Sequence, residues 1–233
     1  MTIVPSLASV LPDYSSATYH DAFSRINGLV VIGEGVANRH FRYLARAIPE
    51  DQEELTRLAD MEARHAAEFV GCAKNLGVKP DLILAKRLFQ PLHDLFLNCE
   101  RYGNIVGCLT IQGVIVECFA LAAYRNYLPV ADSYARPITA AVIDDESLHL
   151  DYAERWLMLN LADVKNIVVD ISRKALPLAV TILKELATDM RALMIDPEEI
   201  IASFSDEFLQ TMESIGFTKK EVSKLLMRAM ASV

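Results

Sequence analysis

The chain of 233 residues is long enough for one well-buried core and close to the length at which a second domain becomes usual, so we expect a single domain over residues 1–233. Its formal net charge of −8 argues against a nucleic-acid partner, because phosphates would repel such a surface. Apolar residues make up 52% of the chain, but polar or charged residues interrupt each apolar run before the ~18 residues that a transmembrane helix needs, so no transmembrane segment is predicted.

The N-terminal segment MTIVPSLASVLPDYSS has no basic start and contains two prolines, which does not fit a signal or transit peptide. A cytoplasmic location is therefore expected. The four cysteines show no CxxC pairing, and most lie in apolar helical surroundings. We expect buried thiols rather than disulfides or a zinc site.

Apolar residues recur at i, i+3 and i+4 from end to end, and alternating strand-like runs are missing, which predicts an all-α protein. After an N-terminal tail over residues 1–15, the expected long helices span about residues 16–48, 49–77, 104–127, 132–161, 163–194, 197–214 and 218–230. Between Pro80 and Gly103 we expect one or two brief helices, interrupted at Pro91, that cross over between two halves of a bundle. Residues 16–161 would form the bundle core, and residues 162–233 would be additional packing helices.

The sequence carries a repeated pattern of one glutamate followed by a Glu-x-x-His motif. Glu34 precedes Glu62 and His65, and Glu117 precedes Glu146 and His149 with nearly the same spacing. In a helix, residues three apart share a face. A four-helix bundle that carries these residues in this order is the arrangement found in dinuclear carboxylate metal sites. A single Glu-x-x-His is common on solvated helix faces, but a carboxylate in an apolar run is costly to bury unless a cation binds it. We therefore predict six metal ligands, namely Glu34, Glu62, His65, Glu117, Glu146 and His149.

Four carboxylates and two imidazoles without a thiolate favour iron or manganese, and iron fits best. Asp60 and Asp145 each precede a ligand histidine by about a turn and could orient it, although both could equally be solvated helix acids. His40 follows Arg39 and is expected to face solvent.

Small and aliphatic residues one turn from Glu34 and Glu117 would leave apolar space beside the metals, which suggests a hydrocarbon-like substrate. Ordinary bundle packing explains the same residues. A dinuclear iron site by itself also leaves open an iron-storage bundle or another diiron oxidase, either desaturase-like or radical-generating.

The segments GLVVIGEGVANRHFRYLA, DMEARHAAEFVGCAKNLGV, QGVIVECFALAAYRNYLPVAD and DDESLHLDYAERWL resemble those of the cyanobacterial aldehyde-deformylating oxygenases, also called aldehyde decarbonylases. The resemblance covers essentially the full length and matches all six metal positions. It implies a ferritin-like four-helix bundle with additional C-terminal helices and a crossover segment.

The resemblance also implies the reaction: a long-chain fatty aldehyde and O2, with electrons from reduced ferredoxin, give an alkane one carbon shorter and formate at two iron ions. An acyl-carrier-protein reductase would supply the aldehyde. Tyr124 and Gln112 are the expected polar groups that help to hold the site. The expected substrate channel runs along Val30, Val31, Phe69, Phe89, Gly113, Ala120 and Ala123, with Tyr124 beside it.

Overall fold

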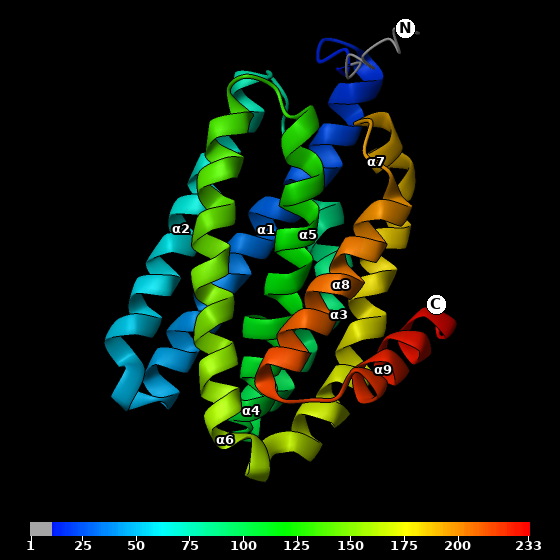
Figure 1. Ribbon diagram of the computed structural model, residues 1–233. Coiled ribbons are helices and arrows are strands. Elements are labelled where there is room, and N and C mark those ends of the chain that lie inside the picture. Colours follow the sequence, from blue (N-terminus) through cyan, green and yellow to red (C-terminus); the bar gives the residue numbers. More distant parts are fainter. Residues whose placement is uncertain (1–10) are drawn as a thin grey trace, which may run out of the picture.

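The computed structural model describes residues 11–233, and every regular element within this range is a helix (Figure 1). The all-α prediction is confirmed for this part of the chain. Most of the predicted N-terminal tail, residues 1–10, lies outside the described residues. The α-helices are α1 (Ala17–Ala47), α2 (Gln52–Asn75), α3 (Leu82–Arg101), α4 (Ile105–Leu109), α5 (Glu117–Tyr127), α6 (Ala135–Glu185), α7 (Ala187–Ala192), α8 (Pro197–Ile215) and α9 (Lys219–Ala231). Three short helical segments join them: the 3-10 turns η1 (Pro49–Asp51) and η3 (Leu128–Val130), and the π-helical segment η2 (Thr110–Val116).

Capping side chains fix several helix ends where the sequence supplies them. Ser16 caps α1 by accepting a backbone N–H, and Asp81 does the same for α3. Thr218 and Glu221 form a capping box at the start of α9. Gly216 ends α8 with a φ of 115°, a left-handed conformation that favours glycine.

Two predicted interruptions are not breaks in the helices. Residues 82–101 form the single helix α3 with Pro91 inside it, and the predicted helices 132–161 and 163–194 lie largely within the 51-residue helix α6. No glycine or proline occurs between residues 160 and 164, so the helical hydrogen bonding continues there. Figure 1 shows that α6 nevertheless bends sharply between its lime and yellow parts, so its two arms run in opposite directions.

The helices that carry the predicted ligands form two packed pairs. Helix α1 packs on α2, and the run α4–η2–α5 packs on α6, while α2 also contacts α6. Helix α3 links the pairs and packs on α1, as the predicted crossover does. Helices α8 and α9 cover the outside of α5 and α6 (Figure 1). This arrangement is a ferritin-like bundle with additional C-terminal helices.

A buried apolar core extends through all these elements, from Tyr19 to Ala229. Within residues 11–233, one helical stretch, Ile105–Val130, has the length and hydropathy of a membrane span, but 78% of its most apolar window is buried inside the protein. It is therefore positioned as the central helix of the bundle. All four cysteines are buried and free, as predicted.

Candidate metal centre

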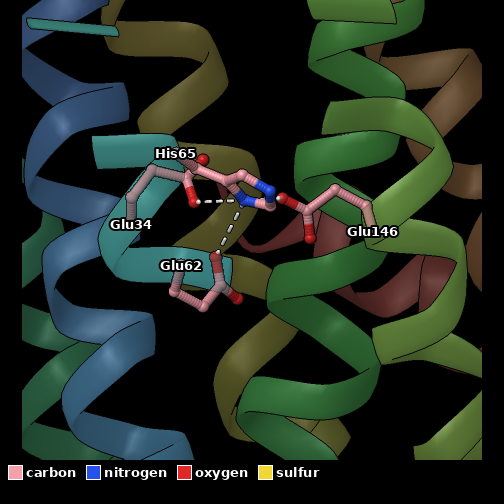
Figure 2. Close-up of side chains that lie close together, drawn as sticks. All are labelled: Glu34, Glu62, His65 and Glu146. Carbon is pink, nitrogen blue, oxygen red and sulfur yellow. Dashed lines mark ion pairs between the residues drawn. The ribbon is translucent and has the colours of Figure 1, made fainter. Parts of the chain in front are cut away.

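The first cluster of predicted ligands surrounds the imidazole of His65 (Figure 2). His65 Nδ1 lies 3.5 Å from Glu34 Oε2, 3.4 Å from Glu62 Oε2 and 3.4 Å from Glu146 Oε1. These side chains come from α1, α2 and α6, and all four are buried. Three helices thus place one imidazole and three carboxylates around a common point.

The second cluster surrounds His149 in the same way. His149 Nδ1 lies 2.9 Å from Glu146 Oε2, 3.1 Å from Glu62 Oε1 and 3.5 Å from Glu117 Oε2. Glu62 and Glu146 therefore belong to both clusters, and each turns one oxygen toward His65 and the other toward His149. Such sharing is the geometry of two carboxylates that bridge a pair of metal ions, with one further glutamate and one histidine for each ion.

The electrostatics of the cluster favour bound cations. Burial raises the pKa of Glu34 and of Glu117 well above the usual range, and the carboxylates of Glu62 and Glu146 add to the effect. Burial by itself lowers the pKa of His149, but the facing Glu62 and Glu146 outweigh it and raise that pKa. If all four carboxylates are ionised, they carry more negative charge than the two histidines can neutralise, so bound cations would favour the ionised form.

Several inward-facing atoms also have no hydrogen-bond partner among the described residues, including both oxygens of Glu62, Glu146 Oε1 and His65 Nδ1. Orphaned buried acceptors are costly, and metal ions at the two clusters would satisfy them. The four-carboxylate, two-imidazole donor set fits a dinuclear site for hard to borderline metal ions such as iron.

The two candidate orienting acids differ in position. Asp145 does not orient His149, the ligand histidine that follows it in the sequence, because its carboxylate contacts His65 Nε2 at 3.1 Å and also pairs with Arg64. It therefore holds the outer side of the His65 imidazole. The side chain of Asp60 is 61% exposed and pairs with Arg42, away from both histidines. The reason is helical geometry: Asp60 lies two residues before Glu62, about 200° around the helix, and so points outward. For Asp60 the alternative of a solvated helix acid is therefore the correct one.

Tyr124 and Gln112, the two remaining polar candidates, each donate a hydrogen bond to an unshared glutamate, meaning a glutamate that belongs to one cluster only. The Tyr124 hydroxyl donates to Glu34 Oε1, and Gln112 Nε2 donates to Glu117 Oε1 at 2.8 Å. Gln112 precedes Glu117 by five residues, a spacing that an α-helix would not place on one face. The π-helical segment η2 makes this contact, because its wider turn brings side chains five apart together.

His40 is also part of this region, although we expected it to face solvent. It is 1% exposed, stacks on Phe96 with the ring centroids 3.5 Å apart, and contacts Gln112 Oε1 through Nδ1 at 2.6 Å. The expectation of a solvent-facing His40 is wrong because His40 lies on the buried stripe of α1, three residues after Ala37 and four before Leu44. That apolar spacing, rather than the neighbouring arginines, was the informative signal in the sequence.

An apolar cavity lies against the carboxylates and Gln112. Of the predicted channel residues, Val30, Phe89, Ala120 and Ala123 line it, as does Tyr124. A second apolar cavity is also lined by Phe69 and shares five residues with the first: Leu29, Val30, Phe119, Ala123 and Tyr124. The two cavities therefore adjoin.

Two predicted channel residues do not line either cavity. A Cβ atom on Gly113 would lie 2.7 Å from Cβ of Ala153, so Gly113 serves the close packing of η2 on α6. Val31 packs against the core outside both cavities. For these two residues the packing alternative is the correct one.

Part of the cavity wall comes from residues that were expected only to pack. These residues, from the second arm of α6 onward, line the second cavity: Leu183, Leu186, Met190, Leu193, Ile195 and Ile200. Nothing in their local pattern distinguishes them from ordinary core residues, because they reach the cavity only through the bend of α6.

The comparisons with known proteins agree with this geometry. The sequence profile of the family described as long-chain fatty aldehyde decarbonylase matches residues 16–231. A solved structure of Protein 19 with aldehyde deformylating oxidase activity from Synechococcus superposes with a TM-score of 0.91 and 59% sequence identity, over 93% of this chain and 99% of that chain. The chain belongs to the long-chain fatty aldehyde decarbonylase family.

Proposed function

We propose that this protein converts a long-chain fatty aldehyde to an alkane one carbon shorter and formate, using O2 at a dinuclear iron centre. The observation that carries the proposal is the contact between two overlapping ligand clusters and an apolar cavity. A polar metal centre at one end of an apolar space suits a molecule with one reactive polar group and a long hydrocarbon tail.

In this proposal Glu34 and His65 would hold one iron, Glu117 and His149 would hold the other, and Glu62 and Glu146 would be shared by both. Bound there, iron would supply the chemistry of O2 reduction and of carbonyl polarisation. Asp145 orients the His65 imidazole through its outer nitrogen. Tyr124 and Gln112 hold the outer oxygens of Glu34 and Glu117 and are positioning residues.

The apolar cavities would position the substrate. The aldehyde group lies at the carboxylates, and the chain extends between Val30, Ala123 and Phe119 into the second cavity. Apolar walls also keep water away from the reacting group. The C-terminal residues 162–233 therefore complete the substrate cavity in addition to packing on the bundle core of residues 16–161, with all of them in one domain.

Reduced ferredoxin is the proposed electron donor, and an acyl-carrier-protein reductase is the proposed source of aldehyde. Both proposals rest on the resemblance to the aldehyde-deformylating oxygenases, whereas iron is also favoured by the four-carboxylate, two-imidazole donor set. A cytoplasmic location remains a prediction from the sequence.

Aldehyde turnover tests the proposal. Iron-loaded protein is given octadecanal, O2 and a ferredoxin reducing system, and hydrocarbon and formate are measured by mass spectrometry. We expect heptadecane and formate in comparable amounts, and none from a Glu117→Ala variant. A product of unchanged carbon number, unsaturated or hydroxylated, would favour a different diiron oxidase. Iron oxidation and mineral formation without hydrocarbon would favour iron storage.

A further inference from the structure

A continuous line of hydrogen bonds connects the protein surface to Glu117. Arg39 Nη1 lies 3.2 Å from His93 Nε2, and His93 Nδ1 lies 2.9 Å from His40 Nε2. His40 Nδ1 lies 2.6 Å from Gln112 Oε1, and Gln112 Nε2 donates to Glu117 Oε1 at 2.8 Å. The line starts at an exposed guanidinium, passes through the half-buried His93, and ends at a fully buried carboxylate.

The chemistry of the two ends fixes every donor in between. A metal-bound carboxylate only accepts, so Gln112 must turn its amide nitrogen to Glu117 and its oxygen to His40. That oxygen only accepts, so His40 carries its proton on Nδ1. At the other end the guanidinium only donates, so His93 Nε2 accepts and its proton lies on Nδ1, directed at His40 Nε2. Each group therefore donates to the next, from Arg39 to Glu117.

The environment of His40 favours this neutral, directed form. Burial lowers the pKa of His40 to about 3, although the Gln112 oxygen acts in the opposite direction. Burial also lowers the pKa of His93, and Arg39 lowers it further. Phe96 stacks on the His40 ring with an interplanar angle of 9°, which holds the ring in the plane that these contacts need.

We propose that His40, supported by His93, is a positioning residue of the metal centre that locks the Gln112 amide onto the outer oxygen of Glu117. The locked amide leaves Glu117 Oε2, which faces His149 Nδ1 at 3.5 Å, as the oxygen for the metal. The unshared glutamate of the other cluster has the matching arrangement, with Oε1 held by Tyr124 and Oε2 facing His65. The proposal rests on the metal-binding role of Glu117 in the proposed function.

Metal binding and spectroscopy of His40→Phe and His40→Asn test the proposal without aldehyde. Phenylalanine keeps the stacking on Phe96 but has no donor, whereas the asparagine amide nitrogen can take the place of Nδ1 and donate to Gln112. We expect His40→Phe to bind one of two cobalt(II) ions about tenfold more weakly, the effect typical of lost outer contacts, and to change the cobalt absorption spectrum. His40→Asn is expected to stay close to wild type in both measurements.

The control is His20→Asn, because His20 lies on the same helix and makes no side-chain hydrogen bond within the described residues. In a double-mutant cycle, His40→Phe should add little to Gln112→Leu, since both remove the same contact. Full additivity, or an equal loss in His40→Asn and His40→Phe, would overturn the proposal and leave the metal assignment intact. A wild-type protein that binds no pair of ions would overturn the metal assignment and this proposal with it.

Discussion

At the scale of single residues, the two clusters contain the same kinds of metal ligand, but the hydrogen bonds that hold those ligands in place differ. Both unshared glutamates have an outer donor, Tyr124 for Glu34 and Gln112 for Glu117. Of the two histidines, His65 has an orienting carboxylate on its outer nitrogen, whereas His149 Nε2 has no partner within the described residues. The two metal positions should therefore differ in affinity, with the His65 side more rigidly held.

Asp145→Ala should weaken metal binding at the His65 cluster by about 10- to 100-fold, because the imidazole loses the group that orients it. Competition titration with a chelator measures the loss. Asp60→Ala is the control, since Asp60 makes only an exposed ion pair with Arg42 and its removal should change stability by no more than about 1 kcal/mol. Equal metal affinities in the two variants would contradict the orienting role of Asp145.

Burial of His40 also predicts a dependence of stability on pH. Its folded-state pKa of about 3 lies below the ~6.5 of an unfolded histidine, so only the unfolded chain takes up this proton between those values. Its contribution to stability is complete above about pH 6.5 and is lost as the pH falls, by at most about 1.4 kcal/mol per pH unit.

Urea unfolding of the metal-free protein at pH 7 and pH 5 measures this loss. His40→Asn should lose less stability over that interval than the wild type, because it lacks the imidazole that takes up a proton only in the unfolded chain. The other titrating groups near this position, including His93 and Arg39, are the same in both proteins. Identical losses would show that His40 is protonated in the folded protein or stays neutral in the unfolded one.

At the scale of the elements, the π-helical segment η2 decides which side chains meet at the centre. Its wider turn places Gln112 beside Glu117, and its approach to α6 is close enough that only a glycine fits opposite Ala153. The apolar run in the sequence predicts a helix here but not its type, because all seven residues of η2 are buried and no apolar stripe distinguishes an α-helical from a π-helical turn.

Gly113→Ala should therefore destabilise the protein although alanine is the better helix former. The new methyl group would lie 2.7 Å from Cβ of Ala153, and overpacking of this kind costs about 1–3 kcal/mol, against roughly 1 kcal/mol of gained helix propensity. Gly35→Ala is the matched control, because an added Cβ there meets no atom within 4 Å. Thermal unfolding should show a lower Tm for Gly113→Ala and a higher one for Gly35→Ala, and the reverse order would contradict the close packing of η2 on α6.

At the scale of the whole molecule, the bend of α6 and the helices after it close the apolar space beside the centre. Residues near the start of the chain, such as Phe23 and Ile26, meet Leu186 and Ile200 from its last third at the second cavity. The preferred chain length of the aldehyde should thus depend on residues that are far in sequence from every metal ligand.

Ile200→Phe should reduce the space in the second cavity and shift the preference toward shorter aldehydes. We expect the ratio of kcat/KM for octadecanal to that for decanal to fall by about tenfold, since one or two methylene groups that no longer fit cost about 1–3 kcal/mol. Ile201→Phe is the control, because the adjacent Ile201 packs outside the cavity. If Ile200→Phe and Ile201→Phe give the same ratio of kcat/KM for the two aldehydes, the hydrocarbon chain of the substrate does not extend into this cavity.

The sequence by itself determined the helical class, most helix ends and the six candidate ligands, because these depend on local periodicity, capping residues and the spacing of side chains along a single helix. Only the tertiary structure decided that Glu62 and Glu146 face both histidines and that Asp145 rather than Asp60 reaches His65. The same holds for the burial of His40 against Gln112 and for the cavity wall formed after the bend of α6. The physical reason is that these contacts join segments far apart in the chain, and their register is set by how the helices pack, which no single helix encodes.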